Sequence, residues 1–224
     1  MNGEDLLALR EQEEFEASVR AARERAAVRA ASAAKPIPAE PEEEIVWSEQ
    51  DDVYRPRPID ARIFLEGLSL PSVPRLRAGE PIVLIRAPAH EAILDHLKSN
   101  VTIELGGLLA GEVGYDRGRD LFVIVVEVAL PALNGEGTAT TFSYTPAAWE
   151  AMLPAWQQMK SEWTIVGSYH SHPGMGVFLS SVDRMTQAEV FPHDWQIAMV
   201  VDPVADKTGM FVGVAGRPSA FAII

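Results

Sequence analysis

Two histidines separated by a single residue, His170 and His172, precede an aspartate, Asp183, in the last third of the chain. The run Trp163–Tyr169 is rich in residues that favour β-strands, and Pro173-Gly174 ends it. Because residues two apart on an extended backbone point to the same side, both imidazoles should project together, as two ligands of one metal ion must. Two neutral imidazoles and one carboxylate, with a fourth position open to water, are the ligand set expected of a catalytic zinc ion.

Each part of this pattern also has a purely structural interpretation. A lone histidine is more often structural than a ligand, and motif matches carry false positives. The pattern Ser180-x-x-Asp183, placed before Met185–Glu189, is also a helix capping box. Capping and ligation are compatible, because Ser180 can cap the helix while Asp183, in its first turn, faces the metal.

The full pattern from His170 to Asp183 is H-S-H-P-G, five further residues, and S-x-x-D. It resembles the metal-binding signature of the JAMM, or MPN-plus (JAB-type), zinc metalloproteases, which include the proteasome-lid deubiquitinase and endosomal deubiquitinases. The resemblance implies one zinc ion per chain, held by His170, His172 and Asp183. It covers about residues 81–224, and the compact domain favours a prokaryotic, deubiquitinase-like member.

The same family has a glutamate far upstream, ahead of a glycine-rich strand, and the matching residue is Glu104, shortly before Gly106-Gly107. The resemblance implies that Glu104 does not bind the metal but takes a proton from the attacking water and later delivers it to the leaving amine. Ser180 is expected to donate a hydrogen bond to the oxyanion, its alternative role being the helix cap alone. Ser171, between the two histidines, is expected to brace the ligand loop.

The resemblance implies hydrolysis of an isopeptide or peptide bond after the Gly-Gly tail of a ubiquitin-like or sulfur-carrier protein. Such a tail could add to the sheet as an extended strand, which reads main chain more than side chains. Three alternatives stay open: processing of a sulfur carrier or a small-molecule amide, a metal-free MPN scaffold, and an interaction module that binds a partner protein through an N-terminal helix.

Composition excludes several function classes. The chain has no cysteine, so neither a disulfide framework nor a thiol nucleophile is available. A net charge of −13 argues against nucleic acid, because phosphate binding needs clustered Lys and Arg. There is no apolar run long enough to span a bilayer, and the first residues lack a secretory signal, so a cytoplasmic location without membrane contact is expected.

Three segments are predicted. Residues 1–34 form a charged helix, residues 35–80 a Pro/Glu-rich linker and possible strap, and residues 81–224 the JAMM/MPN-plus catalytic domain. The expected fold of that domain is α/β, an MPN (JAB) domain with a curved mixed β-sheet flanked by helices. Strands are predicted over 82–85, 102–110, 121–130, 163–169, 197–201 and 210–215, helices over 88–100, 146–161 and 181–190, and a Gly/Thr loop over 134–141.

Two further expectations concern side chains on the predicted helices. Trp149, Leu153 and Trp156 recur at helical spacing and are predicted to face the core. His90 and His96 are too far apart around their helix to share a metal ion and are predicted to be surface residues.

Overall fold

The computed structural model describes residues 54–68, 76–160 and 162–224. All described residues belong to one compact unit, Asp52–Ile224. The charged helix predicted over residues 1–34 and the first part of the predicted linker lie outside the described residues.

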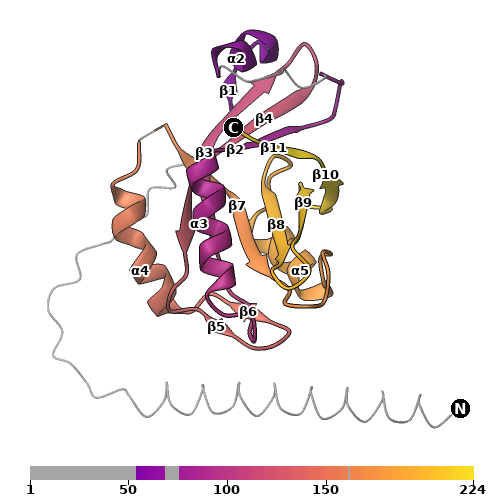
Figure 1. The fold of residues 1–224 in the computed structure, drawn as a ribbon. Coiled ribbons are helices and arrows are strands. Elements are labelled where there is room, and N and C mark those ends of the chain that lie inside the picture. Colours follow the sequence, from indigo (N-terminus) through magenta and orange to yellow (C-terminus); the bar gives the residue numbers. More distant parts are fainter. Residues whose placement is uncertain (1–53, 69–75, 161) are drawn as a thin grey trace, which may run out of the picture. The chain divides into compact units, whose positions relative to one another are not determined.

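In the described part of the chain, nine strands form one mixed sheet in the order β10-β9-β8-β7-β3-β4-β2-β11, with β1 beside β3 (Figure 1). The strands are β1 Arg57–Pro58, β2 Ile82–Ile85, β3 Gly106–Asp116, β4 Leu121–Pro131, β7 Thr164–Ser171, β8 Ile197–Asp202, β9 Lys207–Val212, β10 Arg217–Ser219 and β11 Phe221–Ile223. β3 is antiparallel to β4 and β7, whereas β7–β8 and β2–β4 are parallel. β10 and β11 are the two outermost strands in this order, yet only Ala220 separates them along the chain. The sheet must therefore curve so that its two edges come close together. The predicted curved mixed sheet is confirmed.

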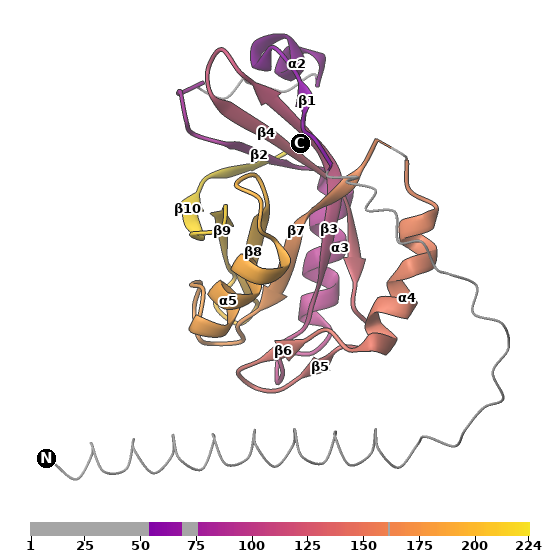
Figure 2. The same cartoon turned by 180° about the vertical axis from the view of Figure 1, so that it is seen from behind.

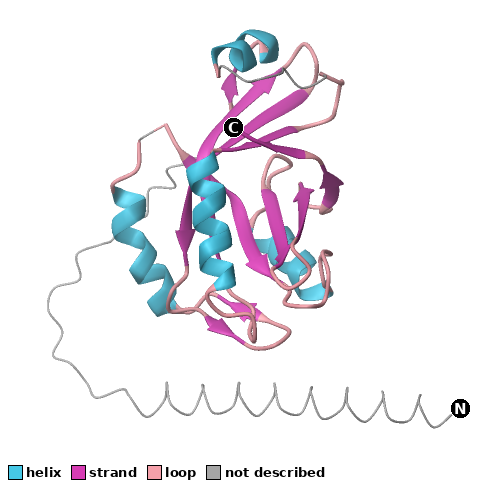
Figure 3. Cartoon of the chain, in the orientation of Figure 1, coloured by secondary structure: helices cyan, strands magenta, loops and turns pink. Residues whose placement is uncertain are grey.

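Helices cover both faces of this sheet (Figures 2 and 3). They are α2 Ala61–Gly67, α3 Ala87–Lys98, α4 Pro146–Gln157 and α5 Ser181–Val190. Neighbouring residues of a strand point to opposite faces. Accordingly, Val126 of β4 packs in one apolar cluster with Leu97 of α3, whereas Val125 packs in another with Leu65 of α2. Met152 anchors α4 over β3 and β4. β4 is therefore buried on both faces, as its unbroken apolar sequence predicts.

The strand predicted over residues 102–110 begins later than expected. β3 starts at Gly106 instead of residue 102 and continues to Asp116. The cause is local: the side chain of Asn100 accepts hydrogen bonds from both the N–H and the hydroxyl of Thr102, which closes a turn where a strand was expected. Glu104 thus lies on a connecting segment ahead of the strand.

Short strands account for the other differences. A small hairpin, β5 (Glu136–Gly137) and β6 (Phe142–Ser143), occupies the predicted loop and its end. The last predicted strand is β9, which ends at Val212, and β10 and β11 follow it. β11 is fixed by pairing with the distant strand β2. β5, β6 and β10 pair with neighbouring segments, but two or three residues are too few for a periodic sequence pattern to reveal a strand.

The prediction that the stripe Trp149, Leu153 and Trp156 faces the core is wrong. These side chains are 42%, 48% and 36% exposed, and the core face of α4 is formed by Ala148 and Met152. The helix carries two adjacent apolar stripes, each with the correct spacing, and periodicity alone does not decide which one is buried.

The prediction that His90 and His96 are surface residues is also wrong. Both side chains are half-buried, and the Nδ1 atom of His96 lies 3.0 Å from the hydroxyl of Tyr169. Tyr169 lies on β7 and is fully buried. Burial lowers the pKa of both histidines, in His90 against an opposing effect of the Glu91 charge. α3 therefore contacts the strand that carries the histidine pair from behind.

Candidate metal centre

β7 and the residue after it place the two histidines in the middle of the sheet. His170 on β7 pairs with Gly106 of β3 on one side and Val200 of β8 on the other. His172 follows the end of β7, and its N–H donates to the carbonyl of Val201 at 2.8 Å. Both side chains are buried, and the backbone of each residue is held by the neighbouring strand β8.

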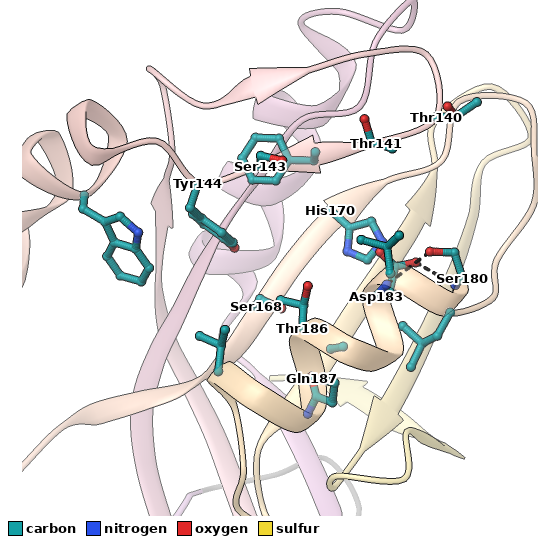
Figure 4. A pocket seen from close by; sticks show the side chains of 16 residues that line it. Thr140, Thr141, Ser143, Tyr144, Ser168, His170, Ser180, Asp183, Thr186 and Gln187 are labelled. Atoms are coloured by element: carbon teal, nitrogen blue, oxygen red, sulfur yellow. Dashed lines mark hydrogen bonds and ion pairs between the residues drawn. The ribbon is translucent and has the colours of Figure 1, made fainter. Parts of the chain in front are cut away.

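α5 brings the aspartate to the same point. The hydroxyl oxygen of Ser180 accepts the N–H of Asp183 at 3.2 Å, and an Asp183 carboxylate oxygen accepts the N–H of Ser180 at 2.7 Å. This reciprocal pair is a capping box, and it holds the carboxylate over the first turn of the helix, facing His170 (Figure 4). Helix capping and convergence on the histidines therefore occur together.

Three side chains converge closely enough to hold one metal ion, namely His170, His172 and Asp183. The two Nε2 atoms lie 3.1 Å apart, and the Asp183 oxygens lie 3.4 Å from His170 Nε2 and 3.5 Å from His172 Nε2. Ligands at about 2.0–2.1 Å from a tetrahedral zinc ion lie about 3.3 Å from one another. The donor types and their mutual spacing therefore fit a zinc ion.

Electrostatics at this point favour an ionised carboxylate. Burial raises the pKa of Asp183, but hydrogen bonds with His170 and His172 outweigh that effect and hold its pKa well below the usual range. A carboxylate that stays charged is the form that binds a cation.

Glu104 lies beside these three residues without belonging to them. Its side chain is 2% exposed, and Oε1 lies 3.7 Å from His172 Nε2 and has no hydrogen-bond partner. Burial raises the pKa of Glu104, an effect opposed by His172 and His170 and reinforced by the charge of Asp183. A buried carboxylate oxygen without a partner is costly, so a role at the site is the expected reason for its presence.

Ser171 joins the strand of the histidines to the segment of Glu104. Its hydroxyl accepts the N–H of Leu105 at 3.0 Å, and its own N–H donates to the carbonyl of Leu105 at 2.9 Å. On its other side, Glu104 donates its N–H to the carbonyl of Thr138, in the loop between β5 and β6, at 2.7 Å. The backbone of Glu104 is therefore held from both sides.

A cavity of about 320 Å³ opens beside the centre (Figure 4). It is lined by residues of the β5–β6 hairpin, β7, β8, α4 and α5, namely Thr140, Thr141, Phe142, Ser143, Tyr144, Trp149, Ser168, His170, Leu179, Ser180, Val182, Asp183, Thr186, Gln187, Val190 and Ala198. Of these described residues, none is Lys or Arg; apart from His170, Asp183 and Gln187, the lining residues carry hydroxyl groups or are apolar. The hairpin wall was not foreseen from the sequence, whose only local signal was a Gly/Thr-rich stretch.

Residues 86–212, more than half of the chain, match the model of a family described as prokaryotic homologs of the JAB domain. The chain belongs to this family, and the resemblance to the JAMM/MPN-plus proteins is thereby confirmed.

Among the helices of the described residues, none combines the length and the apolar character needed to cross a membrane.

Named relatives match part of the chain. It is 34% identical over 132 residues to the ubiquitin carboxyl-terminal hydrolase RPN11 of Saccharomyces cerevisiae, covering 58% of this chain and 41% of that protein. It is 35% identical over 114 residues to COP9 signalosome complex subunit 5 of Caenorhabditis elegans, covering 49% and 29%. The chain thus spans less than half the length of these relatives. A solution structure of a Desulfitobacterium hafniense protein aligns with 64% of this chain and 93% of that chain, at 18% identity and a TM-score of 0.48.

Proposed function

We propose that the chain is a zinc-dependent isopeptidase that cleaves after the C-terminal tail of a ubiquitin-like protein. The observation that carries the proposal is the convergence of three ligand atoms at 3.1–3.5 Å beside a buried, unpartnered carboxylate oxygen. Ligands and a detached base in one place are what hydrolysis by an activated water requires, whereas a scaffold has no use for the unpartnered carboxylate.

In this proposal His170, His172 and Asp183 hold one zinc ion. When bound, zinc lowers the pKa of water to about 7 and polarises the carbonyl of the scissile bond. Because α5 and β7 fix the three side chains before the ion arrives, little reorganisation is needed on binding.

Glu104 moves the proton. Its free Oε1 accepts a proton from the attacking water and then delivers it to the leaving amine, which a carboxylate not used as a ligand can do. Burial raises its pKa, which brings the proton affinity of the carboxylate closer to what both transfers require. Ser180 donates its hydroxyl hydrogen to the oxyanion, in exchange for the side-chain hydrogen bond with Asp183 that helps to lower the pKa of that carboxylate.

The cavity beside the centre accepts the tail of the substrate. The ligands are buried, so the scissile bond has to arrive on a thin segment, and glycines without side chains meet that need. In the described residues β6 pairs with β5 alone, so its other edge offers main-chain groups to an extended tail. Such pairing selects an extended backbone and places few demands on side chains.

The exposed stripe of α4 provides a surface for the folded body of the substrate. Trp149 belongs both to this stripe and to the cavity wall, so the two surfaces are continuous. Exposed tryptophans with a neighbouring leucine are the composition of an interface anchor. A ubiquitin-like protein docked on Trp149, Leu153 and Trp156 would have its tail directed into the cavity.

The test is cleavage of a panel of ubiquitin-like and sulfur-carrier fusions, with and without a chelator, read by mass spectrometry. We expect at least one fusion to be cleaved after its Gly-Gly tail, and the chelator to abolish that cleavage. Cleavage of small amides alone would replace the protein substrate with a small molecule. Absence of both cleavage and stoichiometric zinc would leave a non-catalytic scaffold.

The docking surface is tested separately with Trp156→Ala. For a folded substrate the KM is expected to rise at least about fivefold, corresponding to about 1 kcal/mol of lost contact, while cleavage of a short tail peptide is unchanged. Gln157→Ala, on the same helix and also exposed, is the matched control. Equal effects on folded substrate and peptide would rule out a docking role.

A further inference from the structure

A buried aspartate that is not one of the three candidate metal ligands is hydrogen-bonded to two loops near the metal centre. Asp202, the last residue of β8, is 2% exposed, and its carboxylate accepts four backbone N–H groups. Burial raises the pKa of Asp202, but these four bonds outweigh it and lower the pKa below its usual value. The side chain is therefore a charged hydrogen-bond acceptor at the centre of a backbone cluster.

The four donors come from two different loops. Gly174 and Gly176 belong to the loop after His172, and donate at 2.9 and 2.8 Å. Val204 and Ala205 belong to the turn between β8 and β9, and both donate at 3.0 Å. Oδ1 accepts three of these bonds, and Oδ2 accepts the one from Gly176.

The loop held by Asp202 connects two metal ligands. It starts at His172 and ends at Ser180, the residue that caps α5, and the first turn of α5 carries Asp183. Gly174 and Gly176 have φ of +73° and +86°, a left-handed conformation that bends the loop sharply and that glycine adopts at little cost. The loop also places the ring of Phe178 4.7 Å from the ring of His172. The path of this loop therefore sets where His172 and Asp183 stand relative to each other.

We propose that Asp202 is a positioning residue of the metal centre, which holds the loop between the second and third ligands in the conformation that brings them together before the ion binds. The proposal rests on the ligand set of the proposed function, but not on the nature of the substrate. Without the carboxylate, the N–H groups of Gly174 and Gly176 lose their acceptor, and the loop has no other described contact that pins both glycines. A loop released from Asp202 is free to change its path, and the distance between His172 and Asp183 changes with it.

Asp202→Asn is the informative substitution because an amide has one oxygen in place of two. If the NH₂ group takes the place of Oδ2, the bond from Gly176 is lost. If it takes the place of Oδ1, the bonds from Gly174, Val204 and Ala205 are lost. Asp116→Asn is the matched control: Asp116 is equally buried and also accepts backbone N–H groups, from Ala61 and Arg119, at the far end of β3.

The experiment titrates metal-free full-length protein with Co²⁺, read by visible absorption, and measures zinc affinity by competition with a chelator. Asp202→Asn is expected to weaken metal binding at least about tenfold and to change the Co²⁺ spectrum. Asp116→Asn is expected to lower thermal stability while leaving affinity and spectrum unchanged. If Asp202→Asn does not fold, Gly176→Ala, which strains the same loop with the carboxylate intact, should give the same loss of affinity.

Wild-type affinity and an unchanged spectrum in a folded Asp202→Asn protein would overturn the positioning role. So would an equal loss in Asp116→Asn, or unchanged binding in Gly176→Ala where the first variant does not fold. A wild-type chain that binds no metal would overturn the proposed function as well, whereas normal metal binding without proteolysis would overturn only the proposed substrate.

Discussion

Glu104→Gln separates proton transfer from metal binding. The amide has the same size as the carboxyl group, but it cannot accept a proton from water at neutral pH. The rate of cleavage is expected to fall about 10²–10⁴-fold, the range for a lost general base, which corresponds to about 2.7–5.5 kcal/mol in the activation barrier. Oε1 lies 3.7 Å from His172 Nε2, and Glu104 is outside the ligand set, so zinc content should not change.

The same variant has a predicted effect on stability. Oε1 of Glu104 has no hydrogen-bond partner, so the substitution removes a buried charge without breaking a bond at that atom. The metal-free variant should therefore be as stable as the wild type or more so, and a gain of about 1 kcal/mol would raise its Tm by about 2–4 °C. Single-turnover cleavage, zinc analysis and thermal melting are the three measurements.

Glu112→Gln serves as the control, because Glu112 lies on β3 and pairs with Arg57 at the surface. It should cleave at the wild-type rate. A Glu104→Gln protein that retains its zinc and cleaves at a near-native rate would remove Glu104 from the mechanism. Loss of zinc together with activity would instead make Glu104 a ligand.

Three other substitutions test the surroundings of the centre. His172→Ala should lose stoichiometric zinc together with activity, and a fully metallated, active variant would contradict its assignment as a ligand. Gly137→Ala would place a Cβ atom 2.0 Å from the carbonyl oxygen of Glu104, so the β5–β6 hairpin must move. Activity should fall about 10²-fold with zinc retained. Unchanged kinetics would show that the hairpin does not position Glu104. Burial lowers the pKa of His96, so the unfolded chain binds the proton more readily and stability is lost as the pH falls below about 6.5. His96→Asn keeps an acceptor for Tyr169 and should reduce the drop in Tm between about pH 7.5 and about pH 5.5; an identical drop would refute this origin.

The parts of the fold that follow local rules were predictable. The capping box of Ser180 and Asp183 indicated the start of α5, because the signal for a helix start lies within a few residues of that start. The long apolar run of β4 indicated a strand buried on both faces, and its pairing partners did not need to be known. Convergence of the histidines followed from the two-residue period of a strand.

The parts fixed by distant contacts were not predictable from one sequence. Tyr169 pairs with His96 across a gap of 73 residues, and nothing near His96 indicates that contact. Asp202 precedes a proline and looks like an ordinary turn residue; its role comes from Gly174 and Gly176, 28 and 26 residues away. The buried face of α4 was ambiguous, because the choice between its two apolar stripes depends on the strands beneath it.

The central measurement is the location of zinc in crystals of the purified protein, by anomalous scattering at the zinc absorption edge. We predict one peak per chain, at about 2.0–2.2 Å from Nε2 of His170, Nε2 of His172 and one carboxylate oxygen of Asp183, with Glu104 outside bonding distance. A peak elsewhere, a peak bonded to Glu104, or no peak in protein prepared with zinc would contradict the assignment of this site as a catalytic metal centre.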